Sequence, residues 1–80
     1  MIELLKKNEK VVGFKQTKKA VEQNQIKAVF IASDADQKVI SPTKQLCDVN
    51  GIPVYIVETM KQLGKASGID VGASIVGILQ

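Results

Sequence analysis

Short apolar runs alternate with amphipathic stretches along the chain. The runs are nearly continuous and rich in β-branched residues, a pattern typical of strands that are buried on both faces. They predict a short strand at 11–12 and longer strands at 28–32, 53–57 and 73–79. The amphipathic stretches between them predict helices at 2–9, 15–25, 41–50 and 59–68.

The helix predicted from Ser41 has capping signals at both ends. The Ser41 hydroxyl can accept a hydrogen bond from a first-turn N–H, and Pro42 at the first helical position loses no hydrogen bond. Pro42, Leu46 and Val49 would then share one face, and the Asn50-Gly51 pair would close the helix.

The last predicted helix begins with a capping box, in which Thr59 and Gln62 satisfy each other's backbone donors. Gly64 and Gly68 bring it to an end, and a glycine-bearing loop at 68–72 leads into the final strand. The alternation of helices and strands predicts an α/β fold: a three-layer α/β/α sandwich with a central four-stranded mixed sheet, in which most strands run parallel. At 80 residues the chain has room for one such domain, 1–80, and not for a second core.

The charge of the chain is concentrated near its amino end. All eleven basic residues are lysines, and the formal net charge is +3. Residues 1–27 hold seven lysines and three acids, whereas residues 28–80 hold four lysines and five acids. A local basic surplus suits an anionic partner such as nucleic acid or membrane headgroups, although a lysine run is more often just a solvated face.

The common catalytic and metal-binding side chains are scarce. With no histidine and one cysteine, the chain has no ligands for a common zinc site, no base for a nucleophile and no internal disulfide. Cys47 falls inside a predicted helix and is expected to be a small buried hydrophobe. Asp34 and Asp36 could in principle hold magnesium, but a turn with solvated carboxylates is favoured. We therefore expect a protein without metal or cofactor that is not an enzyme.

The sequence predicts neither a signal peptide nor a membrane span. Lysines and Glu9 interrupt every apolar stretch near the amino terminus. The longest apolar run, Val71 to Leu79, has about half of the ~20 residues that a membrane helix needs, and it is expected to be a buried strand. We expect the protein in the cytoplasm, as a monomer and without a membrane partner.

The segment from Gly13 to Lys19 carries the most unusual chemistry. It places three lysines and an amide at one predicted helix amino terminus. Free backbone N–H groups and the positive end of the helix dipole attract phosphate there, and Lys15 and Lys19 project from the same face. Gln16 can donate and accept at base edges, which lysine cannot do with equal discrimination. In the alternative interpretation the glycine merely ends a strand and the lysines solvate a surface helix, and the pattern alone leaves both open.

Several segments resemble the kink-turn RNA-binding ribosomal proteins of the L7Ae/L30e superfamily. Residues 13–21 are similar to the family's Gly-x-Asn-Glu-x-x-Lys segment, in the Gly-x-Lys-Gln-Thr form of the L30e branch. Further similarities follow in the family's order at 29–36, 46–47, 51–53 and 63–68. The resemblance spans nearly the whole chain and is closest to short bacterial paralogues.

The resemblance implies an α/β/α sandwich that binds RNA bent sharply at an internal loop flanked by tandem sheared G·A pairs. By position, Lys15 and Gln16 occupy the sites that contact the guanines, with Lys19 beside them. Asp36 matches an acidic position that contacts a flipped-out nucleotide, and loop 68–72 matches a segment that packs apolar side chains against extruded bases. The implied RNA-binding residues are Gly13, Phe14, Lys15, Gln16, Thr17, Lys18, Lys19, Asp36, Ile69, Asp70 and Val71.

The chain departs from the family pattern in three places. Lys15-Gln16 replaces the family's Asn-Glu pair, so the hydrogen-bond pattern in the groove must differ. Gln37 replaces a proline after the acidic loop residue, so that loop is expected to be less rigid. The chain ends at Gln80 without the extra carboxy-terminal helix of longer members, so the last strand is expected to be less covered and stability lower.

The leading hypothesis is a non-enzymatic protein that recognises and stabilises kink-turn RNA as part of a ribosome or another ribonucleoprotein. A protein-interaction module whose lysine-rich helix docks on an acidic partner is the alternative. An enzyme on an α/β scaffold would need a pocket with a perturbed acid or base.

Overall fold

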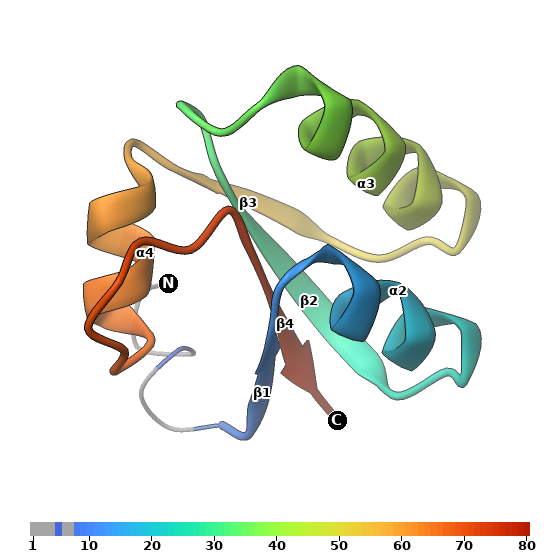
Figure 1. Ribbon diagram of the computed structural model, residues 1–80. Helices are drawn as coiled ribbons and strands as arrows, with labels where there is room; N and C mark the ends of the chain where they lie inside the picture. The colour runs from blue at the N-terminus through green and yellow to red at the C-terminus, as the bar shows by residue number, and fades with distance from the viewer. Residues whose placement is uncertain (1–4, 6–7) are drawn as a thin grey trace.

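The computed structural model describes Leu5 and residues 8–80, so the helix predicted at 2–9 lies largely outside the described residues. The elements follow one another as shown in Figure 1. They are β1 (Lys10–Val12), α2 (Phe14–Glu22), β2 (Ile26–Ala32), α3 (Gln37–Val49), β3 (Val54–Val57), α4 (Met60–Ala66) and β4 (Ile75–Leu79). The predicted alternation of strands and helices is confirmed over this part of the chain.

The strands form one four-stranded mixed sheet in the order β1-β4-β2-β3. β2 and β3 pair in parallel, whereas β4 lies between β1 and β2 and pairs antiparallel with both. The mixed sheet is therefore confirmed, but the expectation of mostly parallel pairing is wrong. β1, β2 and β3 do run in the same direction, and the reversed strand β4 separates β1 from the other two.

The reversed direction of β4 follows from the loop between α4 and β4. This loop runs back along α4, and the Ala73 N–H donates to the carbonyl of Met60, the first residue of the helix, at 3.0 Å. Gly64 lies inside α4 and does not end it; a Cβ there would overlap the carbonyl oxygen of Val71. Because the loop returns to the start of α4, β4 begins at the end of the sheet where β3 finishes.

Helices cover both faces of the sheet, which confirms the three-layer sandwich. Figure 1 shows α2 and α3 on one face and α4 on the other. α2 packs closely on β4 at Gly77, where a Cβ would lie 3.1 Å from Thr17 Cγ2. The largest fully buried side chains, which lie between the layers, include Leu5, Phe30, Ile31, Leu63, Ile75 and Ile78.

α3 begins earlier than the sequence predicted. Asp36, rather than Ser41, is its N-cap, and Asp36 Oδ1 accepts a hydrogen bond from the Lys38 N–H at 2.9 Å. Pro42 therefore lies inside the helix, where its ring leaves the Lys38 carbonyl without the usual donor. The predicted start is wrong because the sequence offers two capping residues here, and the turn predicted at Asp36 is instead the N-cap of the helix.

The buried face of α3 also differs from the prediction. Ile40, Thr43 and Cys47 are buried, whereas Val49 is 77% exposed. The predicted face is rotated by about 100° from the observed one, since successive helical residues differ by that angle. Ile40 lies outside the predicted helix, which starts at Ser41, but in the structure it is part of the helical face that packs on the core.

Candidate nucleic-acid interface

The three segments singled out from the sequence lie together at one end of the sheet. β1, β2 and β3 finish there, and β4 begins there. The Gly13 N–H donates to the Ile75 carbonyl at 2.9 Å, and the Ala32 N–H donates to the Ser74 carbonyl at 2.9 Å. These hydrogen bonds join the start of α2 and the end of β2 to Ser74 and Ile75, where β4 begins. Figure 1 shows the three segments at the same end of the sheet.

The amino terminus of α2 lies at this end of the sheet. Gly13 is its N-cap, with a φ of 99° in the region that favours glycine, and no side chain caps the helix. The first intrahelical donor is the Thr17 N–H, which bonds to the Gly13 carbonyl at 3.1 Å. The N–H groups of the first turn thus have no intrahelical partner and form an anion-binding end.

Polar side chains line the exposed face of α2. Lys15 and Gln16 lie in its first turn, Lys18 follows, and Lys19 belongs to its last turn; all four are exposed, whereas Gly13 and Phe14 are partly buried. Among the described residues the three lysines form no ion pair. Their ammonium groups are therefore available to an anion, and Gln16 stands beside Lys15 at the first turn.

Thr17 belongs to the core side of α2. Its side chain is 1% exposed, and its Oγ1 has no hydrogen-bond partner among the described residues. The side chain faces β4, because a Cβ on Gly77 would contact Thr17 Cγ2. Within segment 13–19, Thr17 is the one residue whose side chain is buried: in the helical register it points into the sandwich while the side chains of its two neighbours point out.

Both aspartates of the loop after β2 hold helix amino termini. Asp36 caps α3, and Asp34 Oδ1 accepts a hydrogen bond from the Met60 N–H of α4 at 2.8 Å. Both residues are exposed, and each of these hydrogen bonds uses one carboxylate oxygen. Groups of three or more His, Cys, Asp or Glu that could hold a metal ion are absent from the described part of the chain.

The cap at Asp36 gives a prediction for stability. Asp36→Ala is expected to lower the free energy of unfolding by about 1 kcal/mol, the usual effect of losing an N-cap. Asp36→Asn is expected to leave it nearly unchanged, because the asparagine side-chain oxygen can accept the same hydrogen bond from Lys38. Urea unfolding of the two variants and the parent protein measures both effects. Equal loss in both variants would contradict the capping role.

The loop before β4 exposes apolar surface. Val71 is 71% exposed, Asp70 is exposed, and Ile69 is partly buried. Val71 lies in the predicted loop 68–72, and the apolar run that starts there becomes the strand β4, predicted at 73–79, only at Ile75. Backbone contacts nevertheless fix the loop: the Ile69 N–H donates to the Gly64 carbonyl at 3.0 Å, and Ala73 is bonded to α4.

Cys47 lies away from this interface, on the buried face of α3. Its side chain is 0% exposed, which confirms the prediction of a small buried hydrophobe. Burial raises the pKa of the Cys47 thiol, because the thiolate would lose its hydration.

The raised pKa of Cys47 predicts a stability that depends on pH. The folded chain keeps the thiol proton to higher pH than the unfolded chain, so the free energy of unfolding is expected to fall as the pH rises above about 8.5. Urea titrations at about pH 7.5 and about pH 9.5 test this, with Cys47→Ala as the control that lacks the thiol. An identical pH dependence in the two proteins would contradict it.

Two residues in this region have roles that were not predicted from the sequence. Asp34 joins the loop after β2 to α4, and Gly64 lets the loop at Val71 pass close to that helix. A capping residue next to a strand end was a signal for the first. No signal was available for the second, because a close approach between a helix and a loop depends on the tertiary fold.

None of the described helices has the length and apolar character needed to cross a membrane.

Comparisons with known proteins give related sequences and folds. The model of the family described as "Ribosomal protein L7Ae/L30e/S12e/Gadd45 family" matches residues 2–80. An RNA-binding protein of Halalkalibacterium halodurans is 47% identical over 68 residues, which cover 85% of this chain and 83% of the relative. The RNA-binding protein YbxF of Geobacillus stearothermophilus is 40% identical over 70 residues, which cover 88% and 85%.

Solved structures of similar fold include two that cover 99% of this chain. A Bacillus halodurans protein of unknown function has a TM-score of 0.88 at 26% identity, with 83% of its own chain covered. The 15.5kD RNA binding protein of Giardia lamblia has a TM-score of 0.89 at 22% identity, with 70% of its chain covered. This second likeness concerns the fold alone.

Proposed function

The chain belongs to the ribosomal protein L7Ae/L30e/S12e/Gadd45 family, and from this premise we propose that it binds RNA and recognises the kink-turn, an internal loop with tandem sheared G·A pairs. The names of its relatives support RNA as the partner, since the relatives described above are RNA-binding proteins. The proposed setting is the cytoplasm, with the protein acting as a monomer within a ribosome or another ribonucleoprotein.

The observation that carries the proposal is the convergence of three segments at one end of the sheet. The start of α2 and the end of β2, from which the next loop leaves, each bond at 2.9 Å to the stretch Ser74-Ile75 that follows the loop before β4. A bent RNA presents phosphates, groove edges and unstacked bases within a short distance. One compact surface with cations, an amide and exposed apolar groups matches these three features.

α2 supplies the charged part of the proposed interface. Lys15 holds one of the two positions that the resemblance places against the guanines, but an ammonium reads base edges with less discrimination than an amide. We therefore assign Lys15, together with the exposed Lys18 and Lys19, to phosphates, which positions the RNA without reading its sequence. Gln16 is also exposed, and its amide would hydrogen-bond to the guanine edges of the G·A pairs in the groove. Thr17 makes no direct contact in this proposal, because its side chain is buried and its N–H donates to the Gly13 carbonyl.

The two loops supply the contacts to extruded nucleotides. Val71 and the partly buried Ile69 would pack against an unstacked base, which gives the exposed apolar surface of Val71 a use. Asp36 uses Oδ1 to cap α3, so its second carboxylate oxygen would accept a hydrogen bond from a flipped-out base. Asp70 lies between Ile69 and Val71 and is exposed at the same loop.

The proposed mechanism is a shift in the population of RNA conformations, with no covalent step. Free RNA samples extended and bent states, and a protein that contacts the bent state selectively shifts the balance by the difference between its two affinities. In this proposal, binding to the bent RNA is itself the activity of the protein.

Binding to matched RNAs tests the proposal. We expect a hairpin with tandem G·A pairs to bind at least about tenfold more tightly than a hairpin in which those pairs are converted to Watson–Crick pairs, a difference of about 1.4 kcal/mol. Gel shifts at several salt concentrations measure this difference, and both affinities should fall as salt rises. Equal affinity for the two hairpins would rule out recognition of the kink-turn.

A further inference from the structure

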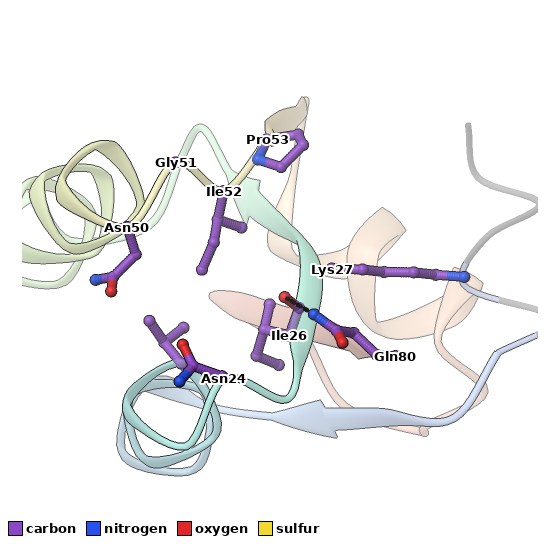
Figure 2. Close-up of a pocket in the computed structure, with 9 residues that line it drawn as sticks. Asn24, Ile26, Lys27, Asn50, Gly51, Ile52, Pro53 and Gln80 are labelled. Atoms are coloured by element: carbon purple, nitrogen blue, oxygen red, sulfur yellow. Dashed lines mark hydrogen bonds between the residues drawn. The ribbon is translucent and has the colours of Figure 1, made fainter.

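A pocket lies at the opposite end of the sheet from the proposed kink-turn surface. Its volume is about 310 Å³, and its lining includes Asn24, Ile26, Asn50, Ile52 and Gln80. We call it the amide-lined pocket. The seven residues of β2 separate it from the first surface by roughly 20 Å. Figure 2 shows Asn50 and Asn24 on one side of the pocket, Gln80 on the other, and Ile26 and Ile52 between them.

The electrostatics of the amide-lined pocket favour a neutral ligand. None of the described residues that line it is acidic. Its one cation, Lys27, extends away from the pocket in Figure 2, and Lys27 Nζ donates to Asn8 Oδ1 at 3.0 Å. α2 and α3 both end at the pocket, and the carbonyl end of a helix dipole repels phosphate. A neutral group with hydrogen-bond donors therefore suits the pocket better than an anion.

Two side-chain amides of the pocket, those of Asn50 and Gln80, are oriented by hydrogen bonds to the backbone. Asn50 Nδ2 donates to the Leu46 carbonyl at 2.8 Å, so Asn50 Oδ1 remains available as an acceptor. In the same way Gln80 Nε2 donates to the Ile26 carbonyl at 3.3 Å, which leaves Gln80 Oε1 available. Because each partner is a backbone carbonyl, only the NH₂ group can face it.

Asn24 supplies the complementary group. Its side-chain amide forms no hydrogen bond among the described residues, so it can rotate to donate or accept. Its backbone has a φ of 58°, and it is the one described residue other than glycine in the left-handed region. The rim of the pocket thus offers fixed acceptor oxygens next to an adaptable donor, with the apolar side chain of Ile52 between them.

We propose that the amide-lined pocket binds one unpaired nucleobase that carries an amino group beside a ring-nitrogen acceptor, namely adenine or cytosine. The amino group would donate to Asn50 Oδ1, the ring nitrogen would accept from Asn24 Nδ2, and the base would rest on Ile52. A volume of about 310 Å³ lies at the small end of the ~300–1,000 Å³ range of ligand pockets, which fits a single base. Uracil in the same register presents a carbonyl where adenine and cytosine present the amino group, so two acceptor oxygens would face each other.

The proposal rests on the proposed function, because an RNA partner supplies the unpaired base. The test is a titration of the ¹⁵N-labelled protein with the oligonucleotides rA4 and rU4, in which the side-chain amide signals of Asn24 and Asn50 are followed. We expect rA4 to shift both signals and to bind at least about fivefold more tightly than rU4, which corresponds to about 1 kcal/mol. No shift at either amide, or equal binding of rA4 and rU4, would overturn the proposal.

Variants separate hydrogen bonding from stacking, which also favours adenine. Asn24→Gly keeps the left-handed backbone and removes the amide, and Asn24→Asp keeps the shape but removes the donor. Both are expected to abolish the preference for rA4, whereas Gln45→Ala, at an exposed amide of α3 outside the pocket, is expected to retain it. Retention of the preference in both Asn24 variants would overturn the proposal.

A hairpin with tandem G·A pairs but no single-stranded extension separates this proposal from the proposed function. If the hairpin binds and shifts α2 signals while rA4 leaves both amides unmoved, the pocket proposal alone fails. If the hairpin binds no better than its Watson–Crick control while rA4 shifts the amides, kink-turn recognition fails and the pocket proposal is supported.

Discussion

Gly64→Ala is expected to destabilise the protein by about 2 kcal/mol, although alanine forms helix better than glycine by about 1 kcal/mol. Gly64 is buried inside α4, and a Cβ there would overlap the Val71 carbonyl oxygen. Neither side can yield easily, because Ile69 and Ala73 bond the loop to the helix on both sides of Val71. Overpacking of this kind costs about 1–3 kcal/mol and outweighs the gain in helix propensity.

Thermal and urea unfolding measure the effect of Gly64→Ala. A loss of about 2 kcal/mol lowers the melting temperature by roughly 8–16 °C in a domain of this size. Lys61→Ala is the matched control, because Lys61 is an exposed position of the same helix and its replacement is expected to change stability by less than about 0.5 kcal/mol. A Gly64→Ala protein more stable than the parent would show that helix propensity decides at this position and that the loop yields.

The elements of the fold were predictable where the local pattern has one interpretation. β2 contains the continuous apolar run 28–32, which neighbouring strands and helices bury, and Gly13 marks the start of α2. The start of α3 was not predictable in this way, because Asp36 and Ser41 are both good capping residues and the tertiary contacts of Ile40 decide between them. Helix propensity and capping rules rank such alternatives only weakly.

The direction of β4 could not be predicted from local sequence patterns, for a different reason. It depends on where the loop after α4 returns, and that depends on a close contact between Gly64 and Val71, seven positions along the chain. The sequence shows Gly64 and Val71 but not that the fold brings them into contact. Sheet order and direction are therefore properties of the assembled fold, whereas the presence of each strand is a property of the sequence.

The candidate interface was predictable as separate segments and not as a surface. Lys15 and Gln16 stood out because of their position at a helix start, and Val71 because of its similarity to a family loop. Their proximity follows from the antiparallel pairing of β1 and β2 with β4, which brings the loop before β4 to the start of α2. The burial of Thr17 within the same segment required the helical register on the sheet.

The double variant Lys15→Ala/Gln16→Ala is expected to weaken binding to the kink-turn hairpin about 100-fold. A lost amide contact to a base edge costs about 1–3 kcal/mol, and each 1.4 kcal/mol is tenfold in affinity. The lost lysine removes one phosphate contact, so the slope of log affinity against log salt should become shallower by about 0.7–0.9. Stability should not fall, because both side chains are exposed and a cation near a helix amino terminus is unfavourable.

The chain offers a matched control on the neighbouring helix, because Lys44 and Gln45 form the same pair of residue types at exposed positions of α3. Lys44→Ala/Gln45→Ala removes the same charge and amide and is expected to change affinity less than about threefold, the equivalent of roughly 0.6 kcal/mol.

The single variants Lys15→Ala and Gln16→Ala then separate the contribution of the charge from the contribution of the amide. Lys15→Ala should weaken the kink-turn hairpin and its Watson–Crick control by the same factor, because a phosphate contact carries no sequence information. Gln16→Ala should weaken only the kink-turn hairpin, because the amide contacts base edges. If Gln16→Ala weakened both hairpins equally, Gln16 would not discriminate between them. If the α3 control variant lost as much affinity as the α2 double variant, binding would depend on total charge and not on the start of α2.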